Sequence, residues 1–306
     1  MSTTELVERR RFTAMGSTVE IVVIGVADRR TVDAAVARIE ELERRWSRFI
    51  DTSEVAELNR NAGAPVAVSD DTRLLVELAC DAWRRTGGRF DPTVLRAVEA
   101  IGYTGSFGPR MPDPGELPCP TLASPRRATS SSGIARPITP TPTRAPDACA
   151  AIVVDRRART VRLPPGVGFD PGGIGKGLAA DLVSFDLGAA GAVGGCVNVG
   201  GDLRVWGRGP HGPRWRIGVG GGTFELTDAG VATSGVERRS WVVDGEPVHH
   251  LIDPATGTPA STGTVGVSVV AGSAWLAETC ATALVVAKPD DVAAEAERWG
   301  VEVLSA

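Results

Sequence analysis

The segment 170–181, DPGGIGKGLAAD, constrains the fold and chemistry of this chain more than any other. Four glycines surround Lys176, and the loop runs directly into the strong helix formers Leu-Ala-Ala. Glycine lets the backbone approach a ligand closely and adopt positive φ. The first turn of a helix offers unpaired N–H groups and the positive end of the helix dipole. The segment therefore predicts a loop that holds an anion, with phosphate the favoured one.

The lysine in this loop is unusual for the chain. Of 33 Lys and Arg residues, only Lys176 and Lys288 are lysines. The loop is not a P-loop, because Asp170 stands where that motif has its first glycine and Gly177 where it has Ser or Thr. A tightly packed strand-to-helix turn is the purely structural alternative.

Composition limits the class of protein. The 306 residues suffice for one large domain or two ordinary ones, and a net charge of −4 disfavours nucleic acid as a partner. No apolar run is long enough to span a bilayer, and the charged start of the chain has no signal-peptide pattern. We therefore expect a cytoplasmic protein without a membrane anchor. Five widely spaced cysteines predict buried thiols rather than a zinc site or disulfides.

The periodicity of apolar residues predicts an α+β fold, with mixed sheets and packed helices. The predicted helices span 31–46, 70–86, 176–189, 274–287 and 290–299. The predicted strands span 18–25, 152–154, 160–163, 196–199, 215–219, 223–226, 240–243 and 264–270. A glycine pair at 87–88 is typical of a helix end.

The stretch 108–146 differs from the rest of the chain. It holds ten of the 21 prolines and few large apolar residues, so it cannot pack a core. We expect a disordered or extended insertion within a single domain at 12–304, preceded by a flexible N-terminus at 1–11.

A metal site is predicted from three oxygen-bearing residues. Glu278 and Thr282 lie four apart, so they share one face of the predicted 274–287 helix. Glu278 also interrupts an apolar run, and a buried carboxylate needs a partner. Together with Asp170 and a phosphate loop, these ligands suit Mg²⁺. A solvated Glu and a Thr bonded to its own backbone are the alternative.

Further segments are ambiguous when each is taken alone. The run NVGGD at 198–202 could be a simple turn. His250 and Asp253 flank an apolar strand end, where a histidine can be structural or catalytic. The segment FDPT at 90–93 follows a glycine pair and is equally open.

Taken in order, these segments resemble the ApbE family, the FAD:protein FMN transferases. The matching runs are MGS at 15–17, RWSRF to LN at 45–59, GGRFDPT at 87–93, DPGGIGKGLAAD, NVGGD, TSG at 233–235, HLIDPATG at 250–257 and AETCAT at 277–282. The resemblance covers roughly 12–288 and implies a single catalytic domain of ApbE or T-fold-like type.

The resemblance also implies the site. FAD would lie against Met15, Phe49, Arg89, Phe90, Asp91, Gly172, Leu178 and Ile252. Mg²⁺ would be bound by Glu278, Thr282 and the backbone carbonyl of Gly175. The chain departs from the family pattern with Glu278 in place of Asp, Gly175 in place of Ala, and no helical character in 108–146.

The implied reaction cleaves the pyrophosphate of FAD and moves FMN onto a Ser or Thr hydroxyl of a partner protein, releasing AMP. Mg²⁺ would neutralise the leaving group, and Lys176 with the loop amides would stabilise charge on the phosphate. His250 or Asp253 would take the hydroxyl proton. Two alternatives are an Mg²⁺-dependent FAD pyrophosphatase and a flavin-binding protein without catalysis.

Overall fold

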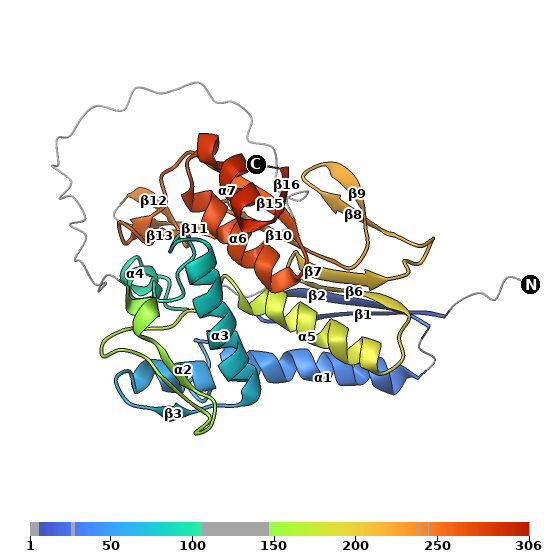
Figure 1. Ribbon diagram of the computed structural model, residues 1–306, viewed down its shortest axis with the longest axis horizontal. Coiled ribbons are helices and arrows are strands. Elements are labelled where there is room, and N and C mark those ends of the chain that lie inside the picture. The colour runs from blue at the N-terminus through green and yellow to red at the C-terminus, as the bar shows by residue number, and fades with distance from the viewer. Residues whose placement is uncertain (1–5, 26–27, 106–146, 238, 244, 306) are drawn as a thin grey trace, which may run out of the picture.

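A seven-stranded sheet with antiparallel neighbours forms the centre of the protein (Figure 1). The computed structural model describes residues 6–25, 28–105, 147–237, 239–243 and 245–305. In spatial order the strands are β1 (Val7–Ala14), β2 (Ser17–Ile24), β6 (Gly194–Val199), β7 (Asp202–Gly207), β10 (Ala229–Gly235), β15 (Gly266–Ala271) and β16 (Glu302–Ser305). The predicted α+β class is confirmed.

The alternation of side chains along β2 creates the two faces of this sheet. Val19, Ile21 and Val23 pack with helix residues in one buried cluster. Val22 and Ile24 point to the other face and join a second cluster. A hairpin of β8 (Trp215–Val219) and β9 (Gly222–Leu226) supplies the cover for that second face.

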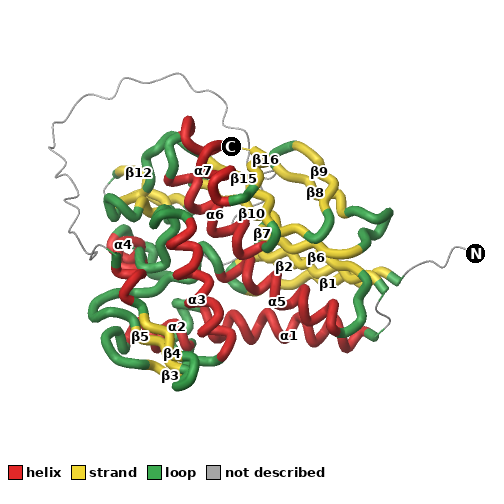
Figure 2. The backbone as a smooth tube through the Cα atoms, in the orientation of Figure 1, coloured by secondary structure: helices red, strands yellow, loops and turns green. Residues whose placement is uncertain are grey.

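Helices cover the first face of the sheet, as the tube view in Figure 2 shows. The helices are α1 (Arg29–Trp46), α2 (Glu54–Arg60), α3 (Asp70–Arg85), α4 (Leu95–Ala100), α5 (Gly175–Ala189), α6 (Ala274–Val286) and α7 (Val292–Trp299). Helix α1 buries one stripe of its surface, including Val32, Ile39 and Trp46, and its N-cap Asp28 accepts a bond from the Arg30 amide. Helices α5 and α6 carry the glycine loop and the predicted metal ligands.

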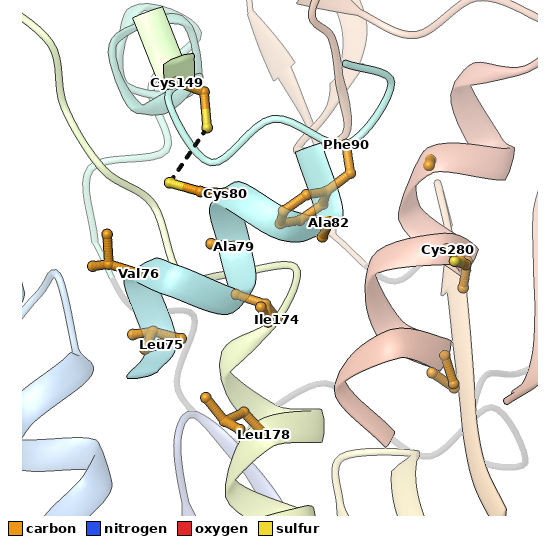
Figure 3. Close-up of a cluster of buried hydrophobic side chains, with 14 of the residues drawn as sticks. Leu75, Val76, Ala79, Cys80, Ala82, Phe90, Cys149, Ile174, Leu178 and Cys280 are labelled. Atoms are coloured by element: carbon orange, nitrogen blue, oxygen red, sulfur yellow. Dashed lines mark hydrogen bonds between the residues drawn. The ribbon is translucent and has the colours of Figure 1, made fainter. Parts of the chain in front are cut away.

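Smaller elements complete the fold, and some of them pack against α3. They are a three-stranded sheet of β3 (Val66–Ala67), β5 (Thr160–Arg162) and β4 (Val153–Asp155), the hairpins β11 (Ser240–Val243) with β12 (Glu246–His249) and β13 (Ile252–Asp253) with β14 (Thr258–Pro259), and the 3₁₀ turns Ala148–Ala151 and Pro289–Asp291. Figure 3 shows Cys80 of α3 facing Cys149, with their sulfurs 3.8 Å apart. Cys80, Cys149, Cys196 and Cys280 are buried free thiols, as predicted.

The structure differs from the sequence prediction at the N-terminal segment and at the last helix. The N-terminal segment 1–11 was expected to be flexible, but residues 7–11 belong to β1, where they pair with β2. The last predicted helix begins at Val292 rather than 290, because a 3₁₀ turn with Pro289 at its start precedes it. The predicted insertion 108–146 lies outside the described residues. In the described parts of the chain, we find no helix with the length and apolar character needed to cross a membrane.

Candidate functional site

One pocket collects residues from segments that lie far apart in the chain. This central pocket is lined by Met15, residues 46–49, 89–91, 170–173 and 233–235, and by Gly175, Lys176, Asp202, Arg239, His250, Leu251, Ile252, Glu278 and Thr282, among others. It therefore contains every predicted site residue except Leu178 and Asp253.

The glycine loop reaches the pocket, but most of its amides already have partners. The Gly172 amide donates to Asp170 Oδ1 at 2.9 Å, and the Gly175 amide to the Pro171 carbonyl at 2.8 Å. The Gly177 amide donates to Glu278 Oε2 at 2.7 Å. The unpaired N–H groups expected in the first turn of the helix therefore have partners at Gly175 and Gly177. An anion in the pocket would depend more on cations than on loop amides.

The loop lysine lies between two buried carboxylates. The Lys176 ammonium is 2.9 Å from Glu278 Oε1 and also contacts Asp202. Both carboxylate side chains are 3% exposed, so each needs a charged partner to offset its desolvation. The cluster of Lys176, Asp202 and Glu278 carries a net charge of −1. Asp202 belongs to the NVGGD motif, whose role the sequence left open.

Helices α5 and α6 touch backbone to backbone beside this cluster. A Cβ on Gly177 would lie 2.4 Å from the Ala274 carbonyl oxygen, so only glycine fits. The Asp181 carboxylate caps α6 by accepting from the Ala274 and Trp275 amides, each at 2.9 Å. Burial raises the pKa of Asp181. This junction fixes Glu278 against the start of α5.

The oxygen donors around the cluster are of the kind that Mg²⁺ prefers. Thr282 Oγ1 lies 3.0 Å from Ser234 Oγ, and Glu278 and Asp202 supply carboxylates in the same pocket. Among the described residues, no group of three or more His, Cys, Asp or Glu residues could hold a metal alone. With Lys176 offsetting one carboxylate charge, these oxygen donors suit a hard cation such as Mg²⁺ that has further ligands from outside the protein.

The hairpin between β1 and β2 brings Met15 to the pocket. Met15 and Gly16 have φ values of 53° and 64°, the left-handed pair that a tight two-residue hairpin turn requires. Such a conformation is uncommon for methionine. Met15 also packs against the two main hydrophobic clusters, which hold it in place.

The end of α3 positions residues 89–91, which line the pocket. The Gly88 amide returns to the Trp83 carbonyl at 2.9 Å, and positive φ at both glycines ends the helix as predicted. Phe90 then lies under the loop, so that a Cβ on Gly173 would meet its ring at 3.0 Å. Asp91 Oδ1 accepts from the Thr93 amide at 2.7 Å. Arg89 pairs with Glu295 at 3.2 Å.

Aromatic residues from three segments pack together, and two of them, Phe49 and Tyr103, line the pocket. The ring centroids of Phe49 and Tyr103 lie 5.8 Å apart, and those of Tyr103 and Trp241 lie 5.6 Å apart. The Trp241 indole donates to the Ile101 carbonyl at 2.8 Å, which ties β11 to this segment. We call Phe49, Tyr103 and Trp241 the aromatic wall. Ile252, a predicted flavin contact, packs in the same buried cluster as Tyr103.

Two predicted site residues lie elsewhere. Leu178 points into the core cluster of Ile174 and Phe90 shown in Figure 3, because the helical turn after Lys176 directs it away from the pocket. Asp253 was a candidate base, but its Oδ1 accepts from the Ala255 amide at 2.8 Å and shapes a turn. Neither residue lines the pocket, so Leu178 as a flavin contact and Asp253 as the base stay predictions.

The neighbouring histidines His249 and His250 differ in their surroundings. His249 Nε2 bonds the Ala260 carbonyl at 2.9 Å, and its Nδ1 accepts from the Leu251 amide at 3.3 Å. His250 lines the pocket, and its buried Nδ1 has no hydrogen-bond partner among the residues that the structure describes. Burial, with a smaller contribution from Arg239, lowers the pKa of His250 to about 3. The imidazole is therefore neutral in the free protein.

Several residues that line the pocket were not singled out from the sequence. They are Arg48, Tyr103, Ser234 and Arg239, and Asp202 was seen only as part of a possible turn. Arg48 and Ser234 stand inside runs that matched the family pattern, but neither carries a local signal of function. Tyr103 is the only tyrosine in the chain, a signal that could have singled it out.

The comparisons with known proteins agree with this geometry. The model of the ApbE family matches residues 15–305. The FAD:protein FMN transferase of Vibrio cholerae is 30% identical over 95% of this chain and 84% of its own length. That of Rhodobacter capsulatus is 29% identical over 96% of this chain and 54% of its own length.

Solved structures give the same result. The ApbE protein of Thermotoga maritima has a TM-score of 0.79 and 29% identity, covering 97% of this chain and 93% of its own. The apo flavinyl transferase ApbE of Pseudomonas stutzeri has a TM-score of 0.77 and 25% identity, covering 98% and 90%. Because the family model, the sequence relatives and the solved structures all span nearly the whole chain, this protein belongs to the ApbE family.

Proposed function

We propose that the central pocket binds FAD and transfers its FMN portion to a Ser or Thr hydroxyl of an acceptor protein, releasing AMP. The observation that carries this proposal is the convergence of three features in one pocket. They are the glycine loop, the Lys176–Asp202–Glu278 cluster, and Phe49 and Tyr103 of the aromatic wall. Membership of a family whose curated relatives are named FAD:protein FMN transferases supports it.

The arrangement of the pocket suits the two ends of the FMN half of FAD. Phe49 and Tyr103 offer ring surfaces for the isoalloxazine ring, with Met15 and Ile252 as apolar neighbours. The diphosphate would then lie near Lys176, where charges of both signs gather. The remaining predicted FAD contacts, Arg89, Phe90, Asp91 and Gly172, line the same space.

Mg²⁺ is part of the proposal. Glu278, Thr282 and the Gly175 carbonyl would hold it, with Asp202 and Ser234 as further oxygen donors on this pocket. When bound, such an ion neutralises charge that develops on the phosphates and on the leaving group. Lys176 holds the two carboxylates in place and adds positive charge beside the diphosphate.

The transfer step makes one bond and breaks another. The acceptor oxygen bonds to the phosphorus of the FMN phosphate, the P–O bond to the AMP phosphate breaks, and AMP leaves with the bridging oxygen. With Asp253 engaged in a turn, His250 is the candidate to accept the hydroxyl proton, at Nδ1. A bound diphosphate would raise the pKa of His250, because it offsets the positive charges of Arg239 and Lys176.

The test uses purified protein with FAD and Mg²⁺, with and without a protein that carries a candidate flavinylation threonine. AMP release and the mass of the acceptor are followed, with a chelator as control. Acceptor-dependent, chelator-sensitive attachment of FMN would support the proposal. AMP release without attachment would indicate the pyrophosphatase, and intact bound FAD a binding protein.

A variant tests the metal assignment. Glu278→Gln should lower FMN transfer by about 100-fold or more, because it removes a charged ligand from a metal-assisted phosphoryl step. Asp71→Asn is a matched control, since Asp71 is a half-buried carboxylate paired with Arg38 outside the pocket. Near-normal transfer by Glu278→Gln would refute the metal assignment. The Ser or Thr acceptor and the cytoplasmic location stay predictions.

A further inference from the structure

Arg48 is a buried arginine at the edge of the central pocket. It follows the last residue of α1 by two positions, and its side chain is only 7% exposed. Removing a guanidinium from water is costly unless its N–H groups and charge find partners. The partners of Arg48 lie in two different parts of the pocket.

The first set of partners is the aromatic wall. The guanidinium carbon lies 4.2 Å from the centroid of the Phe49 ring and 4.6 Å from that of Tyr103. Nη2 also donates to the Tyr103 carbonyl at 2.9 Å. A desolvated cation over both rings holds them more firmly than ring-to-ring packing alone.

The second partner is Asp170, the first residue of the glycine loop. Arg48 Nε lies 3.7 Å from Asp170 Oδ2, and this carboxylate is 14% exposed. The other oxygen of Asp170 accepts from the Gly172 amide at 2.9 Å. The charge of Arg48 therefore acts on the side chain that shapes the first turn of the loop.

We propose that Arg48 is a positioning residue that holds the aromatic wall at a fixed place relative to the glycine loop. The inference rests on the proposed function, because it assumes that flavin lies on the wall and diphosphate near the loop. A single side chain then sets the span between the two subsites that the FMN half of FAD must occupy together.

This role has a specific consequence for ligands. FAD uses both subsites, so it depends on their spacing, whereas AMP lacks the flavin and does not contact the aromatic wall through it. Loss of Arg48 should therefore weaken FAD much more than AMP. A general structural role would weaken both ligands together.

The experiment measures the dissociation constants of FAD, by flavin fluorescence, and of AMP, by calorimetry, with chelator present and no acceptor. Arg48→Met keeps the aliphatic bulk and removes the charge and the planar group. We expect a rise of about tenfold in the constant for FAD, within the range of one desolvated cation–π contact, and no change for AMP. Arg48→Lys should not restore FAD affinity, because an ammonium cannot bridge ring faces and carboxylate as a planar fork does.

Arg38→Met is the matched control. Arg38 also belongs to the α1 region and pairs with a carboxylate, Asp71 at 2.6 Å, but lies outside the pocket. It should leave both constants unchanged. If Arg48→Met does not fold, the Arg48→Lys protein supplies the same comparison. If Arg48→Met weakens the binding of FAD and AMP equally, or does not weaken FAD binding, the inference about Arg48 is wrong but the proposed function is unaffected. A wild-type protein that does not bind FAD overturns the proposed function as well.

Discussion

Gly177→Ala should destabilise this protein, although the same change usually stabilises a helix. Gly177 is the third residue of α5 and has no positive φ, so alanine would gain about 0.5–1 kcal/mol from helix propensity alone. Its added methyl, however, would lie 2.4 Å from the Ala274 oxygen and 2.8 Å from the Trp275 nitrogen. These are backbone atoms, which cannot turn aside as a flexible side chain can.

The magnitude follows from the balance of these two effects. The Asp181 carboxylate holds the Ala274 and Trp275 amides, so α6 can retreat only by losing that cap or by separating from α5. Overpacking of this kind costs about 1–3 kcal/mol, and the fixed backbone places it near the upper end. After the gain in propensity, we expect a net loss of about 2 kcal/mol, or a fall of about 4 °C in Tm.

The assay is thermal and urea unfolding of Gly177→Ala beside Gly188→Ala. Gly188 lies in the same helix, but its added methyl would meet nothing closer than Trp206 Nε1 at 3.9 Å. Gly188→Ala should therefore leave stability unchanged or raise it. If both variants raise Tm, α5 and α6 are not in backbone contact at Gly177 and the reasoning is wrong. FMN transfer should also fall in Gly177→Ala, because the Gly177 amide anchors Glu278.

Two further predictions concern single titratable groups. In the folded protein, burial lowers the pKa of His250 from 6.5 to about 3. Below pH 6.5 the unfolded chain therefore binds a proton at this residue that the folded protein does not bind. Its contribution to stability is present above pH 6.5 and is lost as pH falls, by about 1.6 kcal/mol between pH 6.5 and 5. Urea unfolding at both pH values should show that loss in wild type but not in His250→Gln, and equal losses would contradict it. Asp253→Asn keeps the acceptor for the Ala255 amide, so FMN transfer should be unchanged. A fall of about 100-fold at unchanged Tm would restore Asp253 as the general base.

Local patterns were enough to predict the elements whose apolar period is strong. The stripe on α1 predicted a helix over 31–46, and the structure has Arg29–Trp46. β8 has the predicted ends, because apolar residues alternate along it and a glycine pair follows it, and β11 also has the predicted ends. In contrast, β1 contains VERRRFTA, whose three successive arginines hide its alternation, and pairing with β2 decides its structure.

The candidate site was predictable where a motif alone fixes a side chain. The glycine loop placed Lys176 and Gly175 on the pocket, and the spacing of Glu278 and Thr282 placed both on one face of α6. Leu178 and Asp253 do not line the pocket, and the reason is local geometry. Each stands inside a matching run, but the next turn of the helix or loop directs its side chain away from the pocket.

The contact that assembles the site joins residues about a hundred positions apart, which explains why no local pattern could reveal it. Glu278 accepts from the Gly177 amide, and Asp181 caps the start of α6. Each helix thus satisfies an otherwise unpaired N–H group of the other with a carboxylate. These reciprocal hydrogen bonds require the starts of α5 and α6 to be in direct contact. Only glycine at position 177 leaves room for that contact. The glycine that the sequence assigns to anion binding therefore has a second role, since it lets α6 approach closely enough for Glu278 to meet Lys176.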